Sequence, residues 1–150
     1  DWEPPAELLR FFAPRGDDQI VGLELLAIAL GLCSFSGLLR ERNLCVYSDN
    51  VGSERATSKG RAKAWDHTCI VHSLWLKLAL VRSCMFVKRV PSHENIADLP
   101  SREEYALLSV RGAQFVEPVM DARFWSADAW QSLSAQGIFF ESTPTCVLLV

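Results

Sequence analysis

Three acidic residues stand in stretches of sequence whose neighbours are mostly apolar. Glu24 lies between Leu23 and Leu25 in a long apolar run, Asp49 ends the run LCVYSD, and Asp98 follows VKRVPSHENIA. A buried carboxylate is costly unless it is paired, hydrogen-bonded or bound to a metal ion. Carboxylates brought together raise one another's pKa, so that a cation normally holds them. Oxygen ligands of this kind favour Mg²⁺ or Mn²⁺ over zinc.

Each of these residues also has a simpler structural explanation. Glu24 could lie on the one solvated side of its helix or pair with an arginine. Asp49 could cap the next turn, because Asp-Asn sequences are turn-prone. Asp98 could be a helix-end or salt-bridge residue. On successive elements of one α/β unit, however, the three could meet at the carboxyl-terminal edge of a sheet, where such proteins bind ligands.

Basic residues are concentrated in the middle of the chain. The 150 residues have a net charge of −3, but residues 40–102 carry eleven Arg and Lys against six Asp and Glu. This centre permits a polyanionic partner, although ordinary solvated helix faces would give the same pattern. Lys59, Arg61 and Lys63 closely follow Asp49, and with Asn50 they are the candidate nucleic-acid contacts. Phosphate contacts there would be salt-dependent and independent of sequence.

The pattern of apolar residues, prolines and glycines predicts the elements that must position these side chains. Helices are expected over 6–12, 19–39 and 63–83, strands over 44–48 and 84–90, and a short helix near 95–98 that Pro100 stops. Asp17 or Asp18 is expected to cap the second helix, which is apolar on most faces and therefore buried. Weaker helical patterns follow near 103–110 and 127–137. This alternation predicts an α/β protein.

Composition limits the class of protein further. An apolar fraction of 49% is ample for the core of one domain. No apolar run reaches ~18 residues, so no membrane span is expected. The five cysteines stand singly in apolar runs, which favours buried, reduced thiols in an intracellular protein, cytoplasmic or nuclear.

Five motifs occur in a characteristic order: QIVGLELLAIALGL, VYSDN, a Lys-Gly pair, HSLWLKLAL and VKRVPSHENIADLPSR. Over about residues 15–104 this order resembles the ribonuclease H-like domain of retroelement polyproteins, which follows a reverse transcriptase in LTR and DIRS-type elements. The resemblance implies a mixed five-stranded sheet with helices on both sides. It also implies cleavage of the RNA strand of RNA–DNA hybrids with two Mg²⁺ ions held by four carboxylates.

By matching positions, the resemblance implies roles for individual residues. Glu24, Asp49 and Asp98 would be catalytic carboxylates and ligands of Mg²⁺ or Mn²⁺. His93 compares with a mobile histidine that some members use near the last carboxylate. A surface histidine after a proline is the simpler explanation of His93.

The chain departs from the family pattern at its start. In the family, three antiparallel strands precede the first helix, and the first strand carries the first carboxylate. Here about eighteen residues precede Gln19, and they predict helix and turn. We therefore expect a ribonuclease H-like fold that lacks most of these strands, with impaired cleavage. A polyprotein fragment, a decayed copy, a reused domain without catalysis that binds nucleic acid or protein, and a reading frame without selected function all remain open.

Three segments are expected: a lead-in over 1–18, a ribonuclease H-like core over 19–104 and a C-terminal extension of unknown role over 105–150. Without the first strands, one edge of strand 44–48 would have unpaired backbone groups that recruit other strands. Either the β-prone stretches Thr145–Val150 and Gly137–Phe140 cover this edge, or the chain forms a homodimer through it.

Overall fold

The computed structural model of the protein describes residues 3–14, 16 and 19–135. Its elements, in chain order, are α1 (Ala6–Leu9), α2 (Ile20–Ser34), α3 (Ser36–Leu39), β1 (Asn43–Ser48), α4 (Val51–Lys59), α5 (Trp65–Leu80), β2 (Cys84–Arg89), the 3₁₀ turn η1 (Ser92–Glu94), α6 (Asp98–Ser101), α7 (Ala106–Val110) and α8 (Ala127–Ala135). Helices and strands alternate through the middle of the chain, which confirms the predicted α/β class. No helix in the described residues has the length and apolar character needed to cross a membrane.

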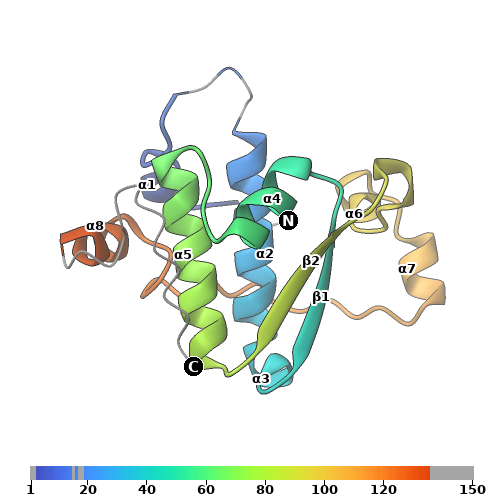
Figure 1. Cartoon of the computed structure of the whole chain (residues 1–150). Helices are drawn as coiled ribbons and strands as arrows, with labels where there is room; N and C mark the ends of the chain where they lie inside the picture. The colour runs from blue at the N-terminus through green and yellow to red at the C-terminus, as the bar shows by residue number, and fades with distance from the viewer. Residues whose placement is uncertain (1–2, 15, 17–18, 136–150) are drawn as a thin grey trace.

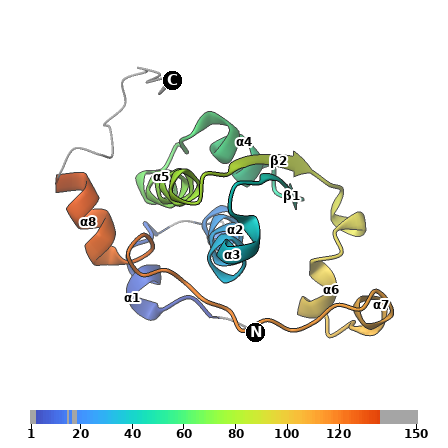
Figure 2. The same ribbon diagram turned by 90° about the horizontal axis from the view of Figure 1, so that it is seen from below.

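The sheet of the described residues has two parallel strands (Figure 1). The register pairs Asn43 of β1 with Cys84 of β2 and runs to Ser48 opposite Arg89. Parallel strands need a long crossover connection, and here α4 and α5 supply it. Helices α2 and α5 pack side by side on one face of the sheet (Figures 1 and 2). Both strands were predicted close to their observed bounds.

The helix predicted over 19–39 is two helices, so that this prediction is wrong in its second half. Helix α2 ends at Ser34, α3 begins at Ser36, and Phe35 between them has φ −106° and ψ 14°. The side chain of Ser34 accepts a hydrogen bond from the Val119 N–H at 3.0 Å, which ties the break to a distant segment. At its start, α2 is capped by Gln19 with a left-handed φ of 62°, whereas Asp17 and Asp18 lie outside the described residues.

The core lies mainly between α2, α5 and the inner face of the sheet. Its buried side chains include Leu25, Leu26, Ala29 and Leu32 of α2, Ile70, Leu74 and Leu78 of α5, and Met85 and Val87 of β2. Trp125 and Trp130, from the segment expected to be an extension of unknown role, are buried in the same core. The part of that extension around Trp125 and Trp130 is therefore packed against the α/β unit, whereas α7 has no buried residue.

The outer face of the sheet is open in the described residues. Cys45 and Tyr47 of β1 and Cys84 and Phe86 of β2 are exposed, as alternation along a strand requires when only one face is covered. The expectation that all cysteines are buried is therefore wrong for Cys45 and Cys84, because both alternate outward. Cys33 and Cys69 are buried, and all four are free thiols.

The predicted cover for the open edge of β1 lies outside the described residues, as does Cys146. Thr145–Val150 and Gly137–Phe140 both fall within 136–150. Self-association through the edge, or its covering by these stretches, therefore stays a prediction.

Candidate carboxylate and basic sites

Glu24 faces the carboxyl end of β1. Its side chain is half-buried, and the Ser48 hydroxyl donates to its Oε2 at 3.4 Å. Burial raises the pKa of Glu24 above its ordinary value, and the negative charges of Asp49 and Asp98 raise it further, while the hydrogen bond from Ser48 acts in the opposite direction. Asp49 and Asp98 are thus each within electrostatic reach of Glu24.

Hydroxyl and amide groups hold the turn that follows β1. The Asn50 Oδ1 accepts the Gly52 N–H at 2.7 Å and the Ser53 N–H at 3.2 Å. The Ser48 hydroxyl accepts the Asn50 N–H at 3.1 Å and lies 2.9 Å from the Ser53 hydroxyl. Asn50, rather than Asp49, is therefore the N-cap of α4.

Asp98 begins α6 and combines two of the roles considered for it. It accepts a hydrogen bond from Asn95 Nδ2 at 2.9 Å and pairs with Arg102 at 3.6 Å, while its charge also acts on Glu24. Pro100 lies inside α6 rather than ending the preceding element, because a proline in the first turn removes no helical hydrogen bond. His93 is exposed, with Nε2 3.6 Å from Glu94 Oε1.

The fit of the carboxylates to Mg²⁺ or Mn²⁺ is incomplete. Their oxygen donors suit these hard cations, and their mutual repulsion is of the kind a cation relieves. Among residues 3–14, 16 and 19–135, however, no group of three or more His, Cys, Asp or Glu side chains is arranged to hold a metal ion. Asp49 and Asp98 each act on Glu24, and the action of the three residues as metal ligands stays a prediction.

The basic residues that follow β1 surround a pocket of about 570 Å³. Lys59, Arg61 and Lys63, predicted from the sequence, line it together with Arg55, which the sequence reasoning missed. The missed signal is the i, i+4 spacing of Arg55 and Lys59, which places them on one side of α4 once that segment is helical. Asn50 does not line the pocket, because it caps the start of the same helix.

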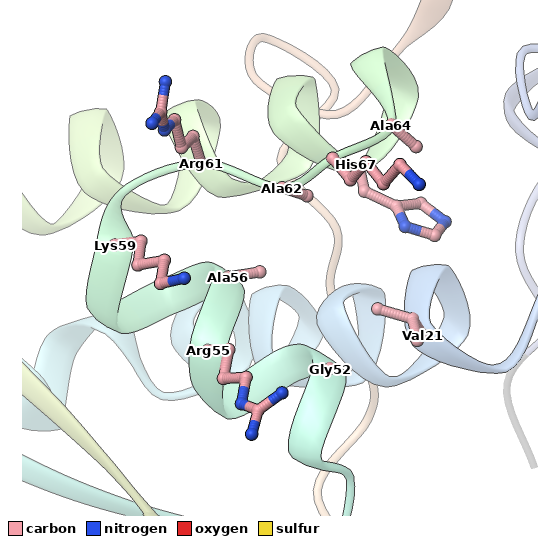
Figure 3. Close-up of a pocket in the computed structure, with 10 residues that line it drawn as sticks. Val21, Gly52, Arg55, Ala56, Lys59, Arg61, Ala62, Ala64 and His67 are labelled. Carbon is pink, nitrogen blue, oxygen red and sulfur yellow. The ribbon is translucent and has the colours of Figure 1, made fainter. Parts of the chain in front are cut away.

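His67 closes the pocket on the side of α5. Its sequence favours an amphipathic-helix residue and leaves contact with nucleic acid as the less favoured alternative. His67 is buried, and its ring lies edge-on to Phe12 with centroids 6.1 Å apart. The neighbouring Asp66 is also buried, and its Oδ2 accepts the Ala13 N–H at 2.9 Å. Figure 3 shows Lys59 and Arg55 on α4, with His67 and Val21 across the opening.

Comparisons with known protein families, with curated proteins and with solved structures find no match for this chain.

Replacing Glu24 with glutamine is expected to stabilise the protein at pH 7. The raised pKa of Glu24 means that its charged form is disfavoured by folding. The contribution of Glu24 to the free energy of unfolding is therefore fully present below its ordinary pKa of 4.5, where the carboxyl group is protonated. It is lost as the pH rises through the higher pKa that Glu24 has in the folded protein. The melting temperature of Glu24→Gln should exceed that of wild type at pH 7 and match it near pH 4.

Glu104→Gln is the matched control for this comparison, because Glu104 is exposed. Its melting temperature should follow wild type at both pH values. A Glu24→Gln variant that is less stable than wild type at pH 7 would show that the Glu24 carboxylate has a cationic partner.

Proposed function

We propose that this chain is a ribonuclease H-like nucleic-acid-processing domain of a retroelement polyprotein, with impaired cleavage of RNA in RNA–DNA hybrids. The observation that carries the proposal is Glu24, half-buried at the carboxyl end of β1 beside Ser48, with its pKa raised first by burial and then by the charges of Asp49 and Asp98. Mutually repelling carboxylates in one place are a feature of functional sites more often than of stable surfaces.

The arrangement of elements supports the proposal. Helix α2, which carries Glu24, precedes β1, and β1 is joined to the parallel strand β2 through α4 and α5. Asp49 follows β1, and Asp98 follows β2. This is the order that the resemblance requires for the second, third and fourth carboxylates. The basic pocket beside the same strand end adds a place for phosphate groups.

The cofactor belongs to the proposal as well. Glu24, Asp49 and Asp98 are the residues that would hold Mg²⁺ or Mn²⁺, which in such a site supplies charge stabilisation and an activated water. We expect weak metal affinity, because the described residues do not form a ready ligand group. The chain's own residues place Glu24 beside Ser48 and present basic side chains to the nucleic acid.

A second candidate function is nucleic-acid binding without cleavage. Two observations favour it: the carboxylates are not grouped as metal ligands, and four cationic residues surround one pocket. Both functions predict binding of an RNA–DNA hybrid, and only the first predicts cleavage.

A cleavage assay with an end-labelled RNA–DNA hybrid, in Mg²⁺ and separately in Mn²⁺, tests the proposal. The wild-type chain is expected to bind the hybrid and to cut its RNA strand weakly. Asp49→Asn should abolish that cleavage, because it removes a negative charge needed to hold a cation, whereas the exposed Glu104→Gln should leave it unchanged.

The outcomes separate the candidates. Weak cleavage that is lost in Asp49→Asn supports the ribonuclease. Binding without cleavage in either metal supports the second candidate. Robust cleavage that is lost in Asp49→Asn would contradict the impairment, and cleavage that survives Asp49→Asn would place the active site elsewhere. A chain that is folded but neither binds nor cuts the hybrid would overturn both functions.

A further inference from the structure

The pocket beside α4 collects cationic side chains without matching carboxylates. Within the described part of the chain, Arg55, Lys59, Arg61 and Lys63 form no ion pair, whereas Lys77, Arg82, Arg102 and Arg123 each pair with a carboxylate. Like charges around one opening repel one another, and a bound anion would relieve that repulsion. The charge of the pocket therefore favours an anionic ligand.

The interior of the pocket is apolar. Val21, Ala56, Ala62 and Ala64 line it between the cations. Helix α4 is held close to α2, since a Cβ at Gly52 would lie 2.7 Å from Val21 Cγ2. In this apolar floor, Val21 and Ala56 belong to the packed helices α2 and α4, while Ala62 and Ala64 belong to the connection between α4 and α5. A volume of about 570 Å³ is within the usual range for small-ligand pockets, which combine apolar walls with a few polar groups.

The start of α5 lies beside the same pocket. This helix has 16 residues, and its N-cap, Ala64, lines the pocket and offers no side-chain hydrogen bond. Uncapped N–H groups and the helix dipole favour anions at such an end. Here Asp66 in the first turn already supplies a negative charge, since its Oδ1 accepts the His67 N–H at 2.9 Å while its Oδ2 accepts the Ala13 N–H at 2.9 Å. The attraction for an anionic ligand therefore rests on the four cationic side chains of the pocket.

We propose that this pocket binds one nucleotide unit, with its phosphate on Arg55, Lys59 and Lys63 and its apolar part on the alanine-lined floor. The shared chemistry is a phosphate ester, which a nucleic-acid strand or a free nucleotide can supply. The site is separate from Glu24, Asp49 and Asp98, and it needs no metal ion. It extends the proposed function by naming the unit of ligand that the basic segment holds.

The test is a binding titration in EDTA, which keeps it independent of metal-dependent cleavage. A fluorescent single-stranded oligonucleotide is the probe, and unlabelled oligonucleotide, ATP and inorganic triphosphate are the competitors. Lys59→Gln is expected to weaken oligonucleotide binding about 5- to 10-fold at low salt, and to reduce the slope of log K against log salt by about 0.7. If ATP competes as well as oligonucleotide at equal nucleotide concentration, free nucleotides are ligands too; if it does not, the source is a strand.

Two further variants distinguish binding in the pocket from binding elsewhere on the surface. Lys88→Gln removes an exposed lysine of β2 that lies outside the pocket, and it should leave affinity unchanged. Ala62→Trp fills the apolar floor without changing charge, and it should weaken ATP and oligonucleotide more than triphosphate. Melting temperatures near wild type establish that each variant is folded.

Two results would overturn the inference. Equal losses in Lys59→Gln and Lys88→Gln would show diffuse surface attraction rather than a pocket. Full affinity in folded Lys59→Gln and folded Ala62→Trp would show that the ligand is bound elsewhere or not at all.

Discussion

Replacing Trp130 with alanine is expected to destabilise the protein by about 3–5 kcal/mol, the usual cost of removing a buried tryptophan. Trp130 is 0% exposed, and its indole Nε1 donates to the Phe124 carbonyl at 2.8 Å. The same Nε1 lies 3.2 Å from the Ser73 hydroxyl, and the ring packs edge-on to Phe11 at 5.1 Å. Deleting it leaves a cavity where α8 meets α5 and removes the indole donor, while the Ser73 hydroxyl still donates to the Phe124 carbonyl at 2.8 Å.

Urea denaturation followed by circular dichroism measures this loss. Trp65→Ala is the matched control, because Trp65 contacts the same Phe11 ring at 5.2 Å but is 48% exposed. Its cost should be roughly half or less, since much less surface returns to water. Equal costs for the two variants would show that α8 is not part of the cooperative core.

Replacing Asp121 with alanine is expected to lower the free energy of unfolding by about 3 kcal/mol or more, because it leaves a buried lysine without its carboxylate partner. The Lys77 Nζ lies 3.0 Å from Asp121 Oδ2, and both side chains are nearly buried, with exposed fractions of 11% and 13%. Lys77 on α5 would lose its carboxylate partner while remaining in the interior. Arg123→Ala should cost far less, because Arg123 is 79% exposed and its removal leaves the Lys77 pair in place.

The pH dependence of stability provides a second measurement of the Asp121 contacts. Hydrogen bonds from Arg123, and then from Lys77, hold the pKa of Asp121 well below its ordinary value of 3.8, against the opposing effect of burial. This stabilisation is present above pH 3.8 and is lost as the pH falls toward the folded value. The gap in unfolding free energy between wild type and Asp121→Ala should therefore narrow below pH 3.8.

A combined Lys77→Met, Asp121→Leu variant is the final control. Replacing both charges by apolar groups of similar size is often neutral, since neither charge is then left unpaired. Its stability should lie closer to wild type than that of Asp121→Ala. A combined variant that is less stable than Asp121→Ala would show that packing, rather than the stranded charge, sets the cost.

Helix α4 shows what the sequence could not reveal about the fold. The sequence pattern predicts no helix between strand 44–48 and residue 63, yet VGSERATSK forms α4. Its helix depends on the cap from Asn50, on the left-handed Gly60 at its end with φ 69°, and on packing against α2. Tertiary packing stabilises short helices that intrinsic propensity does not.

The sequence predicted the proximity of the three carboxylates but not the packing of the C-terminal extension. The order of Glu24, Asp49 and Asp98 on successive elements predicted that they would be neighbours. The charges of Asp49 and Asp98 do act on the pKa of Glu24, although burial is the largest cause of its rise. The scattered aromatics after residue 112 contained no motif. Trp125 and Trp130 nevertheless complete the core, through contacts with residues more than fifty positions away.

The sequence by itself determined the α/β alternation, the two strands and the basic centre, because apolar periodicity and charge are local properties of the chain. The tertiary structure alone decided that α2 breaks at Phe35, that Arg55 joins the predicted cations, and that His67 and Val21 close the pocket around them. A pocket is the space left between packed elements, and its walls come from residues far apart in the chain. No local pattern encodes how closely α4 approaches α2, which is set by the fit of Gly52 against Val21.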